Sequence, residues 1–475
     1  MFVVTRCELL FDLLRGSYGP LGCHKLMRDQ YGRVETMIQG YHMLKRLEIQ
    51  DPCARLLTHI ATSQHQKCGD GTKTVVLLTI ELLRIAQHVL MKKRFISIDC
   101  IMSGFEAAQF ICQEHLKRSY QEIRGCASNL DVRRAIANAQ AEWICSDDAE
   151  DFVNVILDSC GCKCTFIPVI SKSQKTLLHH GIIIKPTSPK ITFGRRSKQE
   201  HTNILLLDPN EDSTSLQEYC DHYTNSSEST LVLTTIDYDS IKVHTLGHII
   251  FYQVTKQDIQ LASNYFDVHI DKTTRKPIEK FDLTKINMKS HFIDDEHFVL
   301  LSTIFDKNKN ECTLLLAATS MALVNQLEGL VLCVHSLLLD GNLTPGGGAT
   351  EIMLHNELYR RAREMRAEKR SKEDSITATV LEAFGDALLV KPRTLLTSMQ
   401  TEMSAEHTLE RMKRISMECN GKVGININID DKDLICSDVV QRGIVDSLEV
   451  VQTVIKLATT GVSMIMRVNE CIYVE

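Results

Sequence analysis

The segment best suited to chemistry is a glycine-rich hexad, Gly69-Asp70-Gly71-Thr72-Lys73-Thr74. Its two glycines let backbone N–H groups approach a ligand, and the helix predicted to follow directs the positive end of its dipole at them. Phosphate is favoured at such a place, with Asp70 holding a magnesium ion and Thr72 and Thr74 donating hydroxyl hydrogen bonds. Taken alone, the hexad is better explained as a plain helix-capping turn. Its neighbours therefore decide the interpretation.

Helical periodicity surrounds the hexad and returns at the far end of the chain. Apolar residues recur at helical spacing in 8–14 and 51–66, and the stretch 72–92 is apolar nearly all round, which is typical of a helix buried in a helical layer. The pattern returns from about Leu314 to Leu339, and a long helix is expected from Asp446, with that acid capping its N-terminus.

The centre of the chain has a different character. Three short apolar, β-rich runs predict strands at 203–207, 230–234 and 248–254. Helical segments at both ends therefore flank an α/β centre, as expected if one helical domain carries a long insertion. With 475 residues, the chain has room for about three domains.

Composition excludes several classes of protein. Lys and Arg number 54 against 60 Asp and Glu, a net charge of -6 that disfavours a nucleic-acid partner. The 17 cysteines follow a start without signal-peptide features, so we expect reduced thiols in a cytoplasmic protein. The longest apolar stretches are soon cut by charges, and no membrane insertion is expected.

Several further motifs occur in one order along the chain. They are Gly19-Pro20-Leu21-Gly22, Lys25-Leu26-Met27, Asp51-Pro52, the hexad, Pro345 to Glu351, Lys391 to Leu395, and Gly443 to Leu448. This series resembles the group II chaperonins, meaning the archaeal thermosome and the eukaryotic cytosolic T-complex chaperonin. The resemblance covers about residues 7–125 and 310–470 and is weak through the centre.

The resemblance implies an α+β multidomain subunit with the chaperonin fold. A mostly helical equatorial domain would comprise residues 1–140 and 346–475, and a small intermediate domain residues 141–180 and 307–345. An α/β apical domain at 181–306 would bind clients.

The resemblance also implies a pocket for ATP or ADP with magnesium. Asp70 would hold the metal, and Asp446 matches an acidic position near the ribose or base. The expected nucleotide-binding residues are Gly19, Asp70, Gly71, Thr72, Lys73, Thr74, Gly346, Gly347 and Asp446.

Two positions depart from the family pattern where hydrolysis would need acids. In ATP-hydrolysing members, two carboxylates orient and activate the attacking water. The matching positions are Gln39, and Gly329, seventeen positions before Gly346. Glu328 is adjacent, but one helical step turns it by about 100° onto another face. No catalytic residue is therefore assigned, and we expect a degenerate ATPase rather than an active enzyme.

The residues before the phosphate loop depart from the family too. His65, Gln66 and Lys67 stand where acidic residues are usual, and an extra cation there would favour phosphate, so lost hydrolysis need not mean lost nucleotide binding.

The expected function is that of a divergent chaperonin-like subunit that assists the folding or assembly of client proteins. Its partners would be unfolded or assembling clients and other chaperonin-type subunits in a hetero-oligomer. A chain that retains the chaperonin scaffold but has degraded catalytic positions is similar to the McKusick-Kaufman and Bardet-Biedl chaperonin-like proteins. The alternatives are an ATP-hydrolysing cytosolic chaperonin subunit and a non-chaperone scaffold that keeps only the fold.

Two other features have plainer interpretations. The run Cys160-Gly161-Cys162-Lys163-Cys164 suggests a metal cluster, but buried thiols are favoured because no second ligand pair of matching spacing is visible. The basic run from Arg360 to Lys372 is expected to be a solvated helix and loop, with Arg360 and Glu364 paired at i,i+4.

Overall fold

A computed structural model describes most of the chain as two compact units. One unit is made of Met1–Ile156 together with Asn325–Glu475, and the other of Leu157–Val324. Both ends of the chain therefore share one unit, while the three-domain division and its boundaries stay a prediction. The described residues are 2–19, 21–28, 32, 34–91, 96–127, 155–156, 158–159, 162–172, 176–186, 191–193, 202–207, 230–234, 249–266, 285–294, 296–303, 311–368, 372–399, 404–418, 421–426 and 434–468.

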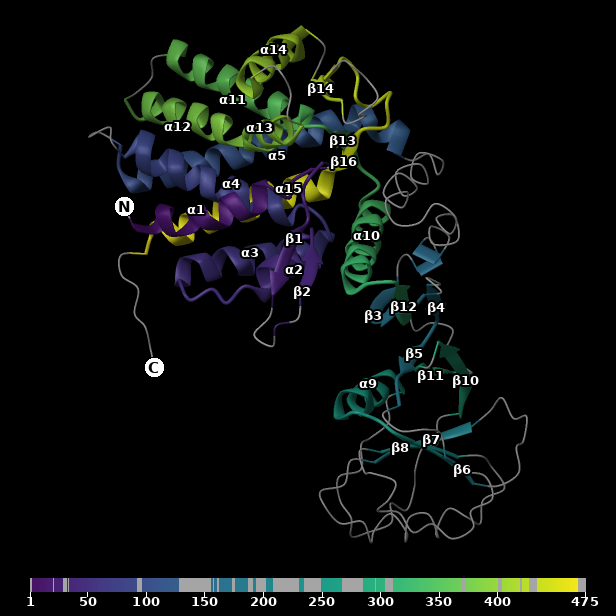
Figure 1. Cartoon of the computed structure of the whole chain (residues 1–475). Coiled ribbons are helices and arrows are strands. Elements are labelled where there is room, and N and C mark those ends of the chain that lie inside the picture. Colours follow the sequence, from purple (N-terminus) through teal and green to yellow (C-terminus); the bar gives the residue numbers. More distant parts are fainter. Residues whose placement is uncertain are drawn as a thin grey trace. The chain divides into compact units, whose positions relative to one another are not determined.

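The unit built from the two ends is mainly helical (Figure 1). Helix α4 packs against α1, α3 and α15, and α12 packs against α5 and α11. Val75, Val76 and Leu77 of α4 are fully buried, which confirms the buried helix predicted from its all-round apolar sequence. The described helices of this unit are α1 (Phe2–Arg15), α2 (Gly40–Arg46), α3 (Pro52–Cys68), α4 (Thr72–Ile85) with the π-helical turn η1 (Ala86–Leu90), α5 (Ile98–Ala127), α11 (Ala349–Glu368), α12 (Lys372–Leu388), α13 (Val390–Ser398), α14 (Ala405–Glu418), α15 (Leu448–Met466) and, from Asn325 on, α10 (Met321–Asp340).

Short strand pairs connect these helices. Strands β1 (Lys25–Arg28) and β2 (Val34–Met37) form an antiparallel hairpin. Strand β13 (Leu343–Pro345) pairs with β16 (Val445–Ser447) and places Thr344 opposite Asp446. A third pair joins β14 (Gly424–Ile425) to β15 (Ile435–Cys436). The β13–β16 pair thus brings the loop before α11 beside the segment that leads into α15.

The second unit contains two sheets. The larger has the order β5-β11-β10-β7-β8-β9-β6, with β7, β8 and β9 parallel, and helix α9 (Lys256–Phe266) buries Ile259 and Tyr265 against it. The smaller has β12 between β3, to which it is parallel, and β4. The strands are β3 (Lys163–Ile170), β4 (Leu177–His179), β5 (Ile182–Ile184), β6 (Ile191–Phe193), β7 (Thr202–Leu207), β8 (Thr230–Thr234), β9 (Ile249–Gln253), β10 (Lys285–Ile293), β11 (Glu296–Thr303) and β12 (Glu311–Ala318). Strands β7, β8 and β9 confirm the three predicted strands.

Two sequence expectations are wrong in detail. The helix expected from about Leu314 begins only at Met321, because 311–318 form the buried strand β12. A short run buried on both faces has no periodicity that separates strand from helix. The last long helix begins at Leu448, and its N-cap residue, Ser447, makes no side-chain capping hydrogen bond within the described part of the chain. Asp446 instead lies in β16, where it is free to face the interior of the site.

One helix among the described residues is long and apolar enough to cross a membrane. This helix is α15, and 61% of its apolar window is buried. It packs against α3, α4 and α5, so most of its apolar surface belongs to the core of the helical unit.

Candidate functional site

A cavity of about 350 Å³ opens within the helical unit, where the phosphate-type loop meets the loops after β13 and before α15. Eight of the nine predicted nucleotide-binding residues line it: Gly19, Asp70, Gly71, Thr72, Lys73, Thr74, Gly347 and Asp446. The ninth, Gly346, does not. A Cβ atom at Gly346 would lie 2.9 Å from the backbone nitrogen of Val445, so this glycine permits the close β13–β16 approach that shapes the wall.

The loop between α3 and α4 takes a conformation that needs glycine. Gly69 ends α3 with φ 68°, and Gly71 precedes α4 with φ 78°, both in the left-handed region. A Cβ at Gly69 would lie 2.6 Å from the backbone oxygen of Gly329, so α10 passes directly against the loop. The side-chain amide of Gln64 donates to the Asp70 carbonyl at 2.9 Å. The loop is therefore held in place from both sides.

Two opposite charges face the cavity from this loop. The Asp70 side chain accepts from the Gly71 N–H at 2.6 Å, yet burial raises its pKa, and Asp446 raises it further. Lys73 donates to the Ser17 carbonyl, and burial lowers its pKa to about 8 against the attraction of Asp70. A nearby cation stabilises the charged form of a buried carboxylate whose pKa is raised in this way, and a nearby anion stabilises the charged form of a buried ammonium. The pair fits Mg²⁺ at Asp70 and phosphate oxygens at Lys73.

Gln39 and Gly329, the two positions where the resemblance leads us to expect carboxylates, lie against each other. The Gln39 side-chain nitrogen donates to the Gln326 carbonyl at 3.4 Å, and a Cβ at Gly329 would lie 2.5 Å from that nitrogen. The Gln39 side chain therefore occupies the space that a side chain at 329 would need. Its Oε1 is buried and has no hydrogen-bond partner among the described residues. An amide oxygen accepts a hydrogen bond, but unlike a carboxylate it brings no negative charge to a bound water.

The wall formed by α11, α13 and β16 carries an ion network, of which the sequence predicted only Asp446 as part of the site. The ammonium of Lys391 lies 2.9 Å from Glu351 Oε1 and 2.5 Å from Asp446 Oδ2. The side chains of Lys391 and Glu351 are only 12% and 9% exposed, and within the described part of the chain Glu351 Oε2 is buried without a hydrogen-bond partner. Burial lowers the pKa of Lys391, but the two carboxylates outweigh it and hold this pKa well above its usual value.

Lys391 and Glu351 both stood within the ordered motifs of the sequence. Nothing in their spacing, 40 positions apart, indicates that they meet. Only the packing of α13 against α11 brings them together.

The residues before the phosphate loop do not supply the expected extra cation. His65 is 4% exposed and stacks on Tyr41 at 4.0 Å between ring centroids. Burial lowers its pKa to about 4, so it is neutral at pH 7. Lys67 lies outside the cavity lining, where it pairs with Glu449 and donates to Thr453 at 3.1 Å. The expectation of added positive charge at the phosphate site is therefore not supported by the positions of His65 and Lys67.

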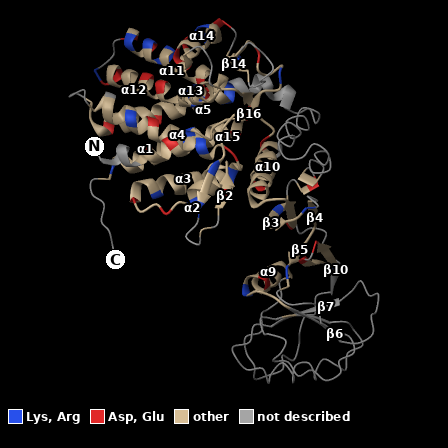
Figure 2. Cartoon of the chain, in the orientation of Figure 1, with Lys and Arg blue, Asp and Glu red and all other residues tan. Residues whose placement is uncertain are grey.

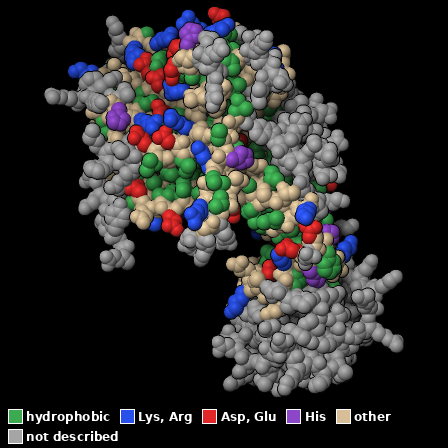
Figure 3. Space-filling model, in the orientation of Figure 1, with side chains coloured by type: hydrophobic (Ala, Val, Ile, Leu, Met, Phe, Trp, Pro, Cys, Tyr) green, Lys and Arg blue, Asp and Glu red, His purple; other side chains and the backbone are tan. Residues whose placement is uncertain are grey.

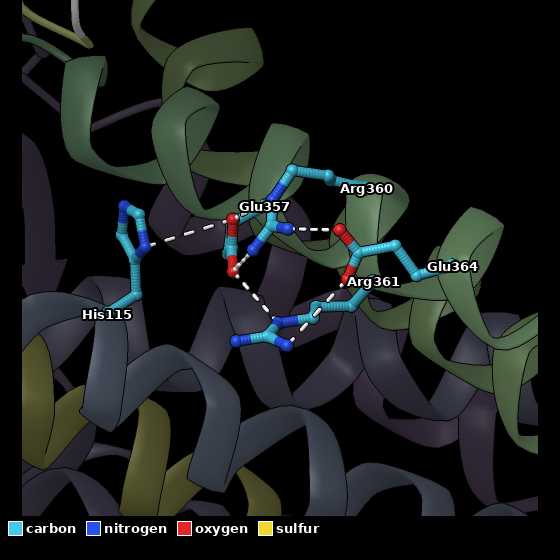
Figure 4. Close-up of polar contacts among 5 residues, drawn as sticks. All are labelled: His115, Glu357, Arg360, Arg361 and Glu364. Atoms are coloured by element: carbon cyan, nitrogen blue, oxygen red, sulfur yellow. Dashed lines mark hydrogen bonds and ion pairs between the residues drawn. The ribbon is translucent and has the colours of Figure 1, made fainter.

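A second polar cluster, outside the cavity, joins α5 to α11 (Figure 4). Glu357 accepts from Arg361 at 3.1 Å and from Arg360 at 2.6 Å, while Arg360 also pairs with Glu364. His115 lies 3.9 Å from Glu357. The side chains of α11 thus neutralise one another, which confirms the predicted Arg360–Glu364 pair.

Basic and acidic residues are also mixed on the helical unit beyond the α5–α11 cluster. They mix along α11 and α12 (Figure 2) and are interspersed on the drawn surface (Figure 3). No group of three His, Cys, Asp or Glu side chains within the described part of the chain has the geometry of a metal site.

Comparison with known proteins places this geometry in context. The sequence model of the TCP-1/cpn60 chaperonin family matches residues 10–208 and 271–475. A thermosome subunit of Pyrococcus horikoshii is 24% identical, with 99% of this chain and 90% of the relative aligned. The T-complex protein 1 subunit beta of Arabidopsis thaliana is 26% identical over 97% of this chain and 92% of the relative. The similarity thus extends through both units.

Proposed function

Because the chain belongs to the TCP-1/cpn60 chaperonin family, we propose that it is a chaperonin-type subunit that binds ATP or ADP with Mg²⁺ but lacks efficient hydrolysis. It serves in protein folding, as its family does. Nucleotide binding and nucleotide hydrolysis, which coincide in an active ATPase, depend on different residues. Binding depends on the phosphate loop and its charges, and hydrolysis depends on groups that place and activate water.

Nucleotide binding is supported by the cavity and its charges. A volume of about 350 Å³ lies within the range of small-molecule sites. The first residues of α4, Thr72, Lys73 and Thr74, line the cavity, and the N–H groups and dipole of a helix N-terminus favour phosphate at such a place. Lys73 would hold phosphate oxygens and Asp70 would hold Mg²⁺, which when bound neutralises phosphate charge. The Glu351–Lys391–Asp446 network closes the opposite wall.

Weak hydrolysis is supported by one observation, the contact between Gln39 and Gly329. By the family resemblance, two water-activating carboxylates would stand at these positions, and here the Gln39 amide nitrogen lies 2.5 Å from where a Cβ on residue 329 would be. The Gln39 amide neither takes a proton from water nor holds it by charge, as a carboxylate would. Glu328 is a poor substitute because it lies one helical step away from Gly329.

The wider role follows from the family. We propose that the chain acts on unfolded or assembling clients, with other chaperonin-type subunits in a hetero-oligomer in the cytoplasm. Retained binding with lost hydrolysis would make it similar to the McKusick-Kaufman and Bardet-Biedl chaperonin-like proteins. In such a subunit, nucleotide would stabilise one conformation rather than drive a cycle.

The decisive experiment measures binding and hydrolysis on the same full-length protein. Calorimetry with Mg-ATP should show saturable binding, and phosphate release should stay at the level of a protein-free control. Lys73→Gln and Asp70→Asn should each weaken binding about tenfold or more, equivalent to about 1.4 kcal/mol. Lys67→Gln is the matched control, because this neighbouring lysine lies outside the cavity lining and should leave affinity unchanged.

The rival functions predict different results. Phosphate release that disappears with Asp70→Asn would show an ATP-hydrolysing subunit. Absence of nucleotide binding, together with stable partner association and no effect on aggregation of unfolded clients, would show a scaffold that keeps only the fold.

A further inference from the structure

Two cysteines face each other across neighbouring strands of the smaller sheet in the second unit. Strands β3 and β12 are parallel, and their register pairs Cys164 directly with Cys312. The two sulfur atoms lie 3.1 Å apart. Adjacent strands lie about 4.7–4.9 Å apart, within the Cα separation of about 4.4–6.8 Å that a disulfide spans. A bond of about 2.05 Å then needs the sulfurs to approach by roughly 1 Å, which side-chain rotation supplies.

A third thiol lies beside this pair but is placed differently. Cys164 Sγ donates to the carbonyl oxygen of Cys162 at 3.5 Å, and Cys162 lies just before β3. Cys312 is 1% exposed, whereas Cys162 and Cys164 are partly exposed. An external reagent therefore reaches Cys164 before Cys312. Cys162 also lies near Cys312, but it is Cys164 that the β3–β12 register pairs with Cys312.

We propose that Cys164 and Cys312 form a reversible disulfide by exchange with a small-molecule disulfide such as oxidised glutathione. This oxidative modification site is independent of the nucleotide cavity. The two cysteines would form a stabilising cross-link between β3 and β12.

The reaction balances in two exchange steps. The Cys164 thiolate attacks one sulfur of glutathione disulfide, and the departing glutathione thiolate takes up the proton that Cys164 released. Cys312 then loses its proton and attacks the Cys164 sulfur of this mixed disulfide, so a second glutathione thiol leaves. Two protein thiols are oxidised, and one glutathione disulfide is reduced to two thiols. A dithiol reductant reverses both steps.

The Cys164–Cys312 disulfide would stabilise the second unit as a whole. The two cysteines are 148 positions apart in sequence, and the intervening chain includes the large sheet and α9. Closing a loop of this length removes conformations from the unfolded chain and stabilises the folded one. The oxidised protein should therefore unfold at a higher temperature than the reduced protein.

The test uses the full-length protein, reduced and then treated with oxidised glutathione. Because the chain has 17 cysteines, the readout is mass spectrometry of peptides digested without reduction. The expected result is a linked peptide pair containing Cys164 and Cys312, an intact mass lower by about 2 Da, and a melting temperature raised by several degrees. Dithiothreitol should reverse all three changes.

Three variants separate this bridge from other oxidation. Cys164→Ser and Cys312→Ala should each abolish the linked pair and the rise in melting temperature, and Cys312→Ala should leave Cys164 as a glutathione adduct. Cys162→Ser, the matched control, should retain both. A Cys162–Cys164 link, glutathione adducts without a bridge, or thiols protected by one bound equivalent of added Zn²⁺ would each overturn the proposal.

Discussion

The side-chain nitrogen of Gln39 lies 2.5 Å from the position that a Cβ atom on residue 329 would occupy. The glycine in α10 and the glutamine before α2 are therefore complementary, since the absence of one side chain makes room for the other. Gln39 also donates to Gln326, one turn before Gly329 on the same helix. The two positions where the family resemblance predicts acids thus form a single packing arrangement.

Substitution of Gly329 should consequently depend on residue 39. In an ordinary helix interior, Gly→Ala stabilises by about 1 kcal/mol. Gly329→Ala in the natural chain should lose this gain, because the Gln39 amide must move and give up its hydrogen bond. In a Gln39→Ala background, the same substitution should stabilise. Urea unfolding of the four proteins should give a coupling energy of about 1 kcal/mol. If the effects of the two substitutions on the free energy of unfolding were additive, they would contradict the contact between residues 39 and 329.

Removal of Lys391 should destabilise the helical unit strongly. Lys391→Met leaves two carboxylates, Glu351 and Asp446, facing each other in a largely buried place, at a cost of about 3 kcal/mol. Adding Glu351→Gln should recover much of this loss, since one charge then remains. Urea unfolding of the Lys391→Met variant and of the double variant measures the two losses in the free energy of unfolding.

The control for this prediction is a surface pair on the same helix. Arg393→Gln breaks an ion pair with Glu406, which is 59% exposed, and should cost less than about 1 kcal/mol. Equal losses for Lys391→Met and Arg393→Gln would show that the buried network has no special importance.

Acid should destabilise the helical unit through His65. Its folded pKa of about 4 lies below the unfolded value of about 6.5, so the unfolded chain binds more protons between these values. Stability is then full above pH 6.5 and falls as the pH drops toward 4. We expect a contribution of about 1–2 kcal/mol to be lost between pH 7 and pH 5.

A variant isolates this effect from other titrating groups. His65→Gln removes the ionisation, so its melting temperature should fall less steeply between pH 7 and pH 5. Its stability at pH 7 should be lower because the stacking on Tyr41 is lost. His59→Gln, on the exposed face of the same helix, should keep the natural slope. Parallel slopes for the His65 and His59 variants would refute the role of His65.

Local pattern sufficed for much of the fold and of the phosphate loop. The all-round apolar sequence of α4 predicted a buried helix, and the glycines of the hexad lie in left-handed conformations that other residues disfavour. These features depend on a few neighbouring residues. Strand β12 was missed because a short, wholly buried run has no period that distinguishes it from a helix.

Contacts between distant segments were decided only by tertiary structure. Residue types at 39 and 329 indicated missing acids, but their mutual packing depends on how α10 passes the phosphate loop. The same holds for Lys391 between Glu351 and Asp446, and for Cys164 opposite Cys312 in the β3–β12 register. Spacing along a chain determines which residues share one helix face or strand face. Which faces meet is determined by burial of the whole core, to which every element contributes.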